Sequence, residues 1–281
     1  MKLTRRQFCA ALALTALPIT GRAGSTVLTI GLFPNLPARR LIELYQPLAD
    51  YLAAQLGCQV RLFSARDFRS FYKATHDNQF DVVVTAPHLA WLAMVESDYR
   101  PLVTFTNPIS GVVIVRRNAP IPVPGNCDGK VVAMIDPLAI VSQLGLEYLK
   151  LIGLTANVDY RVAVYSNHAN AALAVTTAQA DCAVIGKLPF QQMPAEVQSK
   201  LRIIGETQSV PSQFVMVGAA VPASLRERIR TALIGFNYVA VGADFIKTNH
   251  IGAIVAANPD ALAAVKPYAL VTRAMLSQGG E

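Results

Sequence analysis

Two patterns of hydrophobic residues alternate along the chain from residue 26 onward. Short apolar runs, many of them rich in valine and isoleucine, predict strands. Between them, apolar positions recur every three or four residues, which predicts amphipathic helices. The expected strands are residues 27–32, 59–63, 81–85, 102–105, 112–115, 131–135, 161–164, 181–185, 202–204 and 214–217. The expected helices are residues 39–56, 67–74, 87–91, 136–151 and 168–177, and the chain from residue 222 is expected to be mostly helical.

Several helix ends carry their own signals. Gly57 is placed to end the first helix, and Asp67 is placed to cap the second. Pro87 suits the first turn of the third helix, where a missing N–H costs nothing. Strands and helices that alternate in this way predict mainly parallel sheets with helices on both faces.

The segment that begins at Asp81 resembles the segment that begins at Asp181. In both, an aspartate follows a helix with a polar end and precedes a short apolar run. This self-similarity predicts two related lobes. We expect one lobe to contain residues 26–109 and 214–281, and the other to contain residues 110–213.

The predicted fold class is therefore α/β, with two doubly wound lobes joined by a hinge that the chain crosses twice. The crossings are expected near Ser110-Gly111 and near Ser212-Gln213. A cleft between two such lobes collects the carboxyl ends of strands and the amino ends of helices. We expect a small ligand to bind there.

The first residues predict an export signal that is later removed. Lys2 and the pair Arg5-Arg6 precede an uncharged, mostly apolar stretch, which predicts a cleaved signal over residues 1–23. Phe8, two places after the arginine pair, favours the twin-arginine type. An ordinary secretory signal that happens to contain two arginines is the alternative. Either type predicts a periplasmic protein.

Removal of residues 1–23 changes the charge balance. The whole chain of 281 residues has a formal net charge of +7, and the signal takes away four basic residues and no acid, which leaves +3. No dense Lys/Arg run remains, so no nucleic-acid partner is predicted. Hydrophobic residues make up 53% of the chain, enough for a full core. No apolar run after the signal is long enough to span a bilayer.

The reactive residue types form no known catalytic or metal-binding pattern. After Cys9 leaves with the signal, Cys58, Cys127 and Cys182 remain, which allow at most one intramolecular disulfide. Their spacing does not suit zinc. Cys58 and Cys182 abut predicted strands, so we expect both to be small buried residues, with a soft-metal or metalloid role as the alternative. The sequence has no nucleophile elbow, HExxH motif, P-loop or dinucleotide glycine signature. We therefore expect no enzyme activity, no cofactor and no metal site.

Four stretches, taken in order, resemble a known family. They are YQPLADYL (45–52) with Leu56-Gly57 after it, DVVV (81–84), DGKVVA (128–133) with Asp136-Pro137 after it, and NHANAALAV (167–175) with Ala180-Asp181 after it. The sequence resembles the phosphate/phosphite/phosphonate (PhnD-like) solute-binding proteins of ABC transporters, which have the type II periplasmic-binding fold. The resemblance spans most of residues 26–218.

The resemblance implies a hinged, monomeric and non-catalytic receptor. Such a receptor captures a small ligand, an oxyanion by family default, and works with an ABC permease in the inner membrane. A sensor subunit that presents its ligand-closed form to a membrane histidine kinase is the alternative, because both roles use the same closure. A periplasmic enzyme is a less favoured alternative.

Helix amino ends would form the anion site, because their unpaired N–H groups and positive dipole ends attract negative charge. Helix starts near Pro37, Phe68 and His88, within residues 137–142 and at His168 are expected to face the cleft. Of the arginine pair at residues 39–40, we expect Arg39 to lie nearer the cleft. The expected ligand-binding residues are Phe68, Thr85, His88, Leu138, Ala139, Ile140, His168, Ser212 and Gln213.

The sequence departs from the phosphonate-binding pattern at three places. Leu138-Ala139-Ile140 stands where the family usually has a Ser-Thr-Ser type run, so three side-chain donors are missing. Phe68 stands where the family often has tyrosine, and Pro211-Ser212-Gln213 stands where it often has an aspartate. A doubly charged anion in a closed cleft needs many donors. We therefore expect weak or no phosphate binding, and a ligand that is less charged or more apolar.

Overall fold

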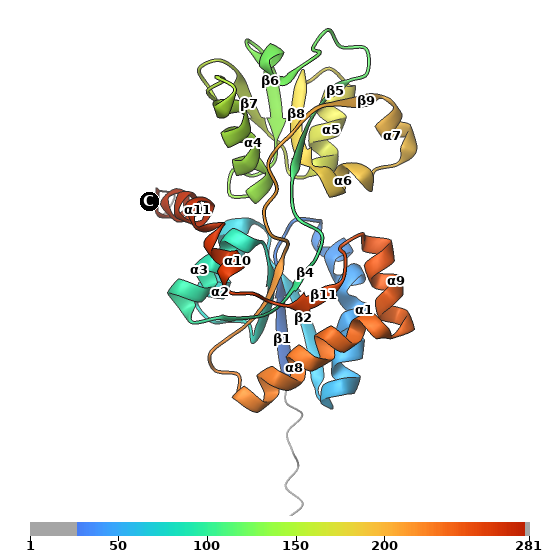
Figure 1. Cartoon of the computed structure of the whole chain (residues 1–281), viewed down its shortest axis with the longest axis vertical. Helices are drawn as coiled ribbons and strands as arrows, with labels where there is room; N and C mark the ends of the chain where they lie inside the picture. Colours follow the sequence, from blue (N-terminus) through green and yellow to red (C-terminus); the bar gives the residue numbers. More distant parts are fainter. Residues whose placement is uncertain (1–26, 279–281) are drawn as a thin grey trace, which may run out of the picture.

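The computed structural model describes residues 27–278, which form two lobes stacked along the long axis of the molecule (Figure 1). The predicted export signal, residues 1–23, lies outside the described residues. Each lobe contains one β-sheet with helices packed against it. The predicted fold class, α/β with two doubly wound lobes, is confirmed.

The first lobe contains a six-stranded sheet of order β11-β4-β10-β3-β1-β2. Its strands are β1 (Val27–Leu32), β2 (Gln59–Ser64), β3 (Val82–Thr85), β4 (Arg100–Phe105), β10 (Phe214–Val217) and β11 (Ile254–Ala256). Its helices are α1 (Ala38–Leu56), α2 (Phe68–His76), α3 (Pro87–Ser97), α8 (Ala223–Gly235), η2 (Phe236–Tyr238), α9 (Ala240–Asn249), α10 (Asp260–Ala263) and α11 (Lys266–Gln278).

The second lobe contains a five-stranded sheet of order β7-β6-β8-β5-β9. Its strands are β5 (Gly111–Arg116), β6 (Val131–Met134), β7 (Arg161–Val164), β8 (Cys182–Gly186) and β9 (Leu201–Glu206). Its helices are η1 (Pro124–Cys127), α4 (Ile140–Leu151), α5 (His168–Thr176), α6 (Lys187–Gln191) and α7 (Ala195–Ser199).

Both sheets are mixed, whereas the sequence predicted mainly parallel sheets. In the first lobe β10 lies between β3 and β4 and runs antiparallel to both. In the second lobe β5 runs antiparallel to both β8 and β9. The reason is the pair of crossings: β5 and β10 each carry the chain away from the hinge, while their central neighbours β3 and β8 run toward it.

The helix-end signals in the sequence work as predicted in the first lobe. Gly57 follows α1 in the left-handed conformation with φ of 67°, which glycine adopts without a steric penalty. The Asp67 carboxylate caps α2 by accepting a hydrogen bond from the Ser70 N–H over 2.7 Å. Pro87 occupies the first turn of α3.

Helix α4 begins later than predicted, at Ile140 instead of Asp136. The Asp136 carboxylate accepts a hydrogen bond from the Leu138 N–H over 2.8 Å, and the Ala139 N–H donates to the Asp136 carbonyl over 2.9 Å. Aspartate side chains favour such turns because they bond their own backbone two residues on. The tight turn at residues 136–139 therefore precedes the helix.

The two lobes share a local design at the predicted repeat. Asp81, before β3, accepts a hydrogen bond from the N–H of Thr29 in the neighbouring β1 over 2.7 Å. Asp181, before β8, accepts one from the N–H of Val131 in the neighbouring β6 over 2.9 Å. In each lobe the carboxylate ties the start of a central strand to the adjacent parallel strand.

The C-terminal part is helical apart from β11, a strand that the sequence did not predict. This strand pairs antiparallel with β4. Three residues, two of them exposed, are too short to show a period of two. Among residues 27–278 no single helix is long and apolar enough to cross a membrane, although Ala223–Tyr238 and Ala240–Asn249 together pass by length and composition as a pair bent by 79°.

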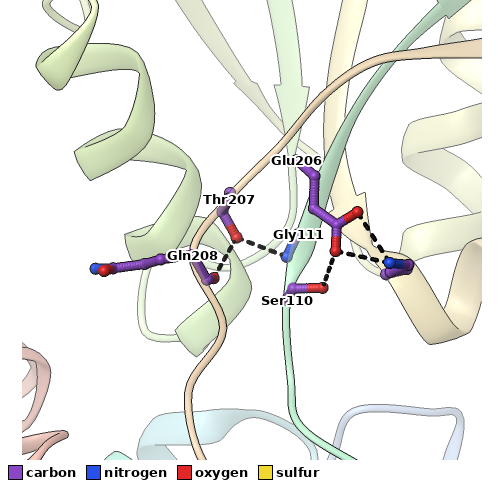
Figure 2. Close-up of polar contacts among 6 residues, drawn as sticks. Ser110, Gly111, Glu206, Thr207 and Gln208 are labelled. Carbon is purple, nitrogen blue, oxygen red and sulfur yellow. Dashed lines mark hydrogen bonds and ion pairs between the residues drawn. The ribbon is translucent and has the colours of Figure 1, made fainter.

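The chain passes between the lobes at residues 106–110 and again at residues 207–213, and the two passages are bonded to each other. Ile109 and Val210 form an antiparallel bridge with two hydrogen bonds of 2.9 Å. At the second-lobe end, the Thr207 hydroxyl accepts a hydrogen bond from the Gly111 N–H over 2.8 Å, and the Ser110 hydroxyl donates to Glu206 over 3.0 Å (Figure 2).

Helix α11 contacts both lobes outside the two crossings. It packs against α3 of the first lobe, and Arg69 of α2 donates to its Leu276 carbonyl over 2.6 Å. From the second lobe, Gln143 Nε2 of α4 donates to Thr272 Oγ1 over 2.7 Å. The C-terminal helix thus forms a third connection between the lobes.

Candidate ligand-binding site

A cavity of about 770 Å³ lies between the lobes, beside the two crossings. The first lobe supplies the loop after β1, the start of α1 and the end of α9. The second lobe supplies the starts of α4 and α5 and the α6 region. Both crossings contribute as well. This is where the carboxyl ends of strands and the amino ends of helices were expected to meet.

Six of the nine expected ligand-binding residues line this cavity. They come from α2, from the start of α4, from the start of α5 and from the second crossing. They are Phe68, Ala139, Ile140, His168, Ser212 and Gln213.

The other three expected residues lie outside the cavity wall. Thr85 faces a separate small void beside α3, and its Oγ1 has no hydrogen-bond partner among residues 27–278. His88 and Leu138 meet each other instead: the His88 side chain is fully buried, and its Nε2 donates to the Leu138 carbonyl over 2.9 Å. These two residues therefore join α3 of the first lobe to the turn before α4 of the second.

His168 is held at the cavity wall as a neutral imidazole. It begins α5, which Asn167 caps by accepting a hydrogen bond from the Asn170 N–H over 2.9 Å. The Gly186 N–H donates to His168 Nδ1 over 3.3 Å, so the ring proton lies on Nε2. Burial lowers the pKa of His168 to about 4. His168 Nε2 has no hydrogen-bond partner among residues 27–278, so its N–H is a free donor at neutral pH.

Gln213 is fixed at the second crossing by both its backbone and its side chain. Its carbonyl accepts from Thr104 Oγ1 over 2.9 Å and from the Phe105 N–H over 3.3 Å. Its Oε1 accepts from the buried Tyr45 hydroxyl over 3.2 Å. The amide NH₂ group is therefore left to donate at the cavity.

The start of α4 presents backbone donors between apolar side chains. No side chain caps this helix at Ala139. The N–H groups of Ser142 and Gln143 turn back to the Ala139 carbonyl, whereas those of Ile140 and Val141 have no partner among residues 27–278. Unpaired N–H groups in the first turn of a helix attract acceptors and negative charge.

The charged side chain nearest the cavity is Arg40, not Arg39 as the sequence indicated. Arg40 lines the cavity. Arg39 points away, with 92% of its side chain exposed, and forms an ion pair of 2.8 Å with Glu43 one turn along α1. Residues one position apart on a helix face different directions, and the sequence did not show which of the two faces inward.

Sequence reasoning missed several residues of the wall, among them Asn35, Asn107, Asn249 and the segment 188–194. The Asn35 Oδ1 is buried and has no hydrogen-bond partner among residues 27–278. Its place just after β1, at the carboxyl end of a central strand, was a usable signal. No local pattern marks segment 188–194 or Asn249, because only the tertiary fold brings them to the cavity.

The cysteines lie apart from this site. Cys127 and Cys182 are buried, Cys58 is half-buried, and all three are free thiols. None of them lines the cavity. Within residues 27–278 no group of three or more His, Cys, Asp or Glu side chains is placed to hold a metal ion. The metalloid alternative therefore has no support at the cavity.

A family model matches residues 30–262 of the chain, and its description is "ABC transporter, phosphonate, periplasmic substrate-binding protein". The chain belongs to this family. The match covers both lobes and the cavity between them. It confirms the family that the sequence resembles and the role of a solute-binding protein that works with an inner-membrane permease. It also implies a periplasmic location. The sensor alternative has no support from this match.

Solved structures show the same fold. A binding protein component of an ABC phosphonate transporter from Pseudomonas aeruginosa is 16% identical, with a TM-score of 0.78, over 89% of this chain and 87% of that one. PhnD1 from Prochlorococcus marinus in complex with methylphosphonate is 10% identical, with a TM-score of 0.79, over 88% and 98%. A Xanthomonas citri protein bound to chloride ion is 18% identical, with a TM-score of 0.76, over 89% and 99%.

Proposed function

We propose that this member of the phosphonate-transporter family captures its solute in the cavity between the lobes and presents the closed form to the permease. The moving units are residues 26–109 with 214–281, and residues 110–213, which rotate about the two crossings. The protein acts as a monomer after cleavage of an export signal over residues 1–23, of the twin-arginine type. It binds without catalysis.

One observation carries this proposal: free hydrogen-bond donors from different parts of the chain meet at one cavity. His168 and the start of α4 come from the second lobe, and Gln213 comes from a crossing. Opening of the lobes would separate these donors, so a ligand that pairs with all of them stabilises the closed form. A ligand shifts such an equilibrium by its difference in affinity for the two forms.

Binding without catalysis is supported by the chemistry of the wall. General acid–base catalysis needs a group whose pKa lies near the working pH. Burial takes the pKa of His168 to about 4, and no carboxylate lines the cavity within the described residues. The other histidine of the wall, His250, is exposed to solvent. The proposed ligand-contacting residues are those that both the sequence and the cavity indicate: Phe68, Ala139, Ile140, His168, Ser212 and Gln213.

The test is native mass spectrometry of the mature protein, from Gly24 on, purified from the periplasm without denaturation. We expect a small solute to remain bound, and solutes that bind the folded state also raise the melting temperature. Ile140→Trp, which fills the cavity, should abolish both signals. Leu151→Trp is the control: it is on the same helix with 77% exposure, and it should behave like the wild type.

Two outcomes would contradict the proposal. One is a folded Ile140→Trp protein that retains the solute as well as the control does. The other is a wild-type protein that carries no solute and shows no thermal shift with phosphate, phosphite, alkylphosphonates or neutral solutes.

A further inference from the structure

The cavity has little charge for its size. Of the side chains that line it within residues 27–278, Arg40 is the one that is always charged, and none is a carboxylate or a lysine. Arg40 is exposed, so water and salt screen its charge. Lys187 lies near the first crossing but is paired with Glu206 at 2.8 Å. The buried wall therefore offers no counter-charge to a doubly charged anion.

Two side-chain donors at the wall, those of His168 and Gln213, are fixed and neutral. His168 presents Nε2–H because the Gly186 N–H occupies Nδ1. Gln213 presents its NH₂ group because the Tyr45 hydroxyl occupies Oε1. Hydrogen bonds between neutral groups are roughly half as strong as those in which one partner is ionised. A ligand that meets these two groups needs acceptor atoms, and nothing in their chemistry requires it to be ionised.

One unpaired acceptor lies buried beside the same space. The Asn35 Oδ1 is buried without a partner among residues 27–278, and Asn35 lines the cavity. A buried polar atom that stays unpaired is destabilising. Because this oxygen is closed off from the cavity, the polar side-chain groups that a ligand meets at His168 and Gln213 are donors.

Apart from Ser110, Ser212 and Asn249, the rest of the buried wall is mainly apolar. Phe33, Phe68, Ile135 and Ile140 line the cavity, each at most 7% exposed. They belong to one continuous apolar cluster that extends from the first lobe into the second. Sites of about 300–1,000 Å³ with mostly apolar walls enclose drug-sized organic molecules, and a cavity of about 770 Å³ is in that range.

We infer that the solute is an organic molecule with an apolar body and a hydrogen-bonding head that carries at most one negative charge. This inference rests on the proposed function, because it describes the ligand of the same cavity. The head accepts hydrogen bonds from His168 and Gln213. The apolar body packs against Phe68 and Ile140.

A matched series separates charge from shape. Hexylphosphonate, its monomethyl ester and its dimethyl ester share one chain and one phosphoryl oxygen and carry two, one and no negative charges. Their dissociation constants are measured by calorimetry above the pH of the second phosphonate ionisation, with methylphosphonate as a reference. We expect at least one ester to bind tenfold or more tightly than the dianion. His168→Phe should weaken that ester about tenfold, as expected for a neutral hydrogen bond.

Binding of the dianion as tightly as the esters, or more tightly, would overturn the inference and leave solute capture intact. Absence of binding by the whole series would also overturn it. The proposed function is tested separately, by whether the purified protein retains a solute in native mass spectrometry. A retained dianion refutes only the ligand class, whereas an empty protein that no solute stabilises refutes solute capture itself.

Discussion

His88 Nε2 donates a hydrogen bond to the Leu138 carbonyl over 2.9 Å and thereby joins the two lobes behind the cavity. His88 lies in α3 of the first lobe, and Leu138 lies in the turn before α4 of the second. His88 is completely buried. If the lobes open as proposed, this bond is lost, and it would then contribute to the free energy of closure.

Removal of this bond should weaken solute binding. In His88→Leu the Leu138 carbonyl loses its nearer donor and keeps Gln143 Nε2 at 3.5 Å. We expect affinity to fall about fivefold, since the lost bond contributes about 1 kcal/mol. His88→Gln keeps a donor near the Nε2 position and is the matched control. Calorimetry with the retained solute checks this. Equal affinities for the two variants would show that the bond has no role in closure.

The free energy of unfolding should decrease as the pH is lowered from 6.5 to about 4. Burial lowers the pKa of both His88 and His168 from 6.5 to about 4. Below pH 6.5 the histidines of the unfolded chain take up protons that those of the folded chain do not. The free energy of unfolding is therefore at its full value above pH 6.5 and decreases as the pH falls toward 4. The loss is roughly 3 kcal/mol for each histidine. Urea unfolding between these pH values measures it.

The double variant His88→Gln/His168→Gln is the control for that window. It should show a much flatter dependence between pH 6.5 and 4, because no buried imidazole remains to titrate. An unchanged slope would assign the effect to other groups and would contradict the neutral state of these two rings.

The third connection between the lobes makes a separate prediction. Gln143 Nε2 and Thr272 Oγ1 are 2.7 Å apart, and both side chains are buried. Thr272→Val keeps the shape but leaves the amide without this partner, which should cost about 1–3 kcal/mol. The solute-free protein should also become more open, as small-angle scattering can measure. Thr155→Val, at an exposed position, should change neither property.

Close packing of α4 on β8 sets the shape of the second lobe. A Cβ atom at Gly145 would lie 2.5 Å from Val184 Cγ1, whereas one at Gly125 would meet nothing within 4 Å. Gly145→Ala should therefore destabilise the protein by about 1–3 kcal/mol, and Gly125→Ala should be near neutral. Urea unfolding midpoints compare the two. A neutral Gly145→Ala would mean that α4 is free to shift outward.

Local chemistry made much of the fold predictable. Gly57 and Asp67 mark helix ends because their conformation and side chain act within a few residues, and the structure has both ends where the sequence indicated them. Strand direction was not predictable in the same way. Whether β10 pairs parallel or antiparallel depends on where the chain re-enters the first lobe, and no local period records that.

The candidate site was predictable where it consists of helix starts. His168 begins α5 and lines the cavity. The direction of side chains was harder to predict. Thr85 and His88 follow a central strand, as ligand-contacting residues often do, yet both turn away from the cavity wall. The pairing of Tyr45 with Gln213 joins residues 168 positions apart, which only the folded chain reveals.

The most direct test of the central claim is a crystal structure of the protein with the solute that it retains from the periplasm. The account predicts density for an organic molecule in the cavity between the lobes, within hydrogen-bond distance of His168 Nε2 and of the Gln213 amide. A solute bound elsewhere on the protein, with this cavity empty, would contradict the account.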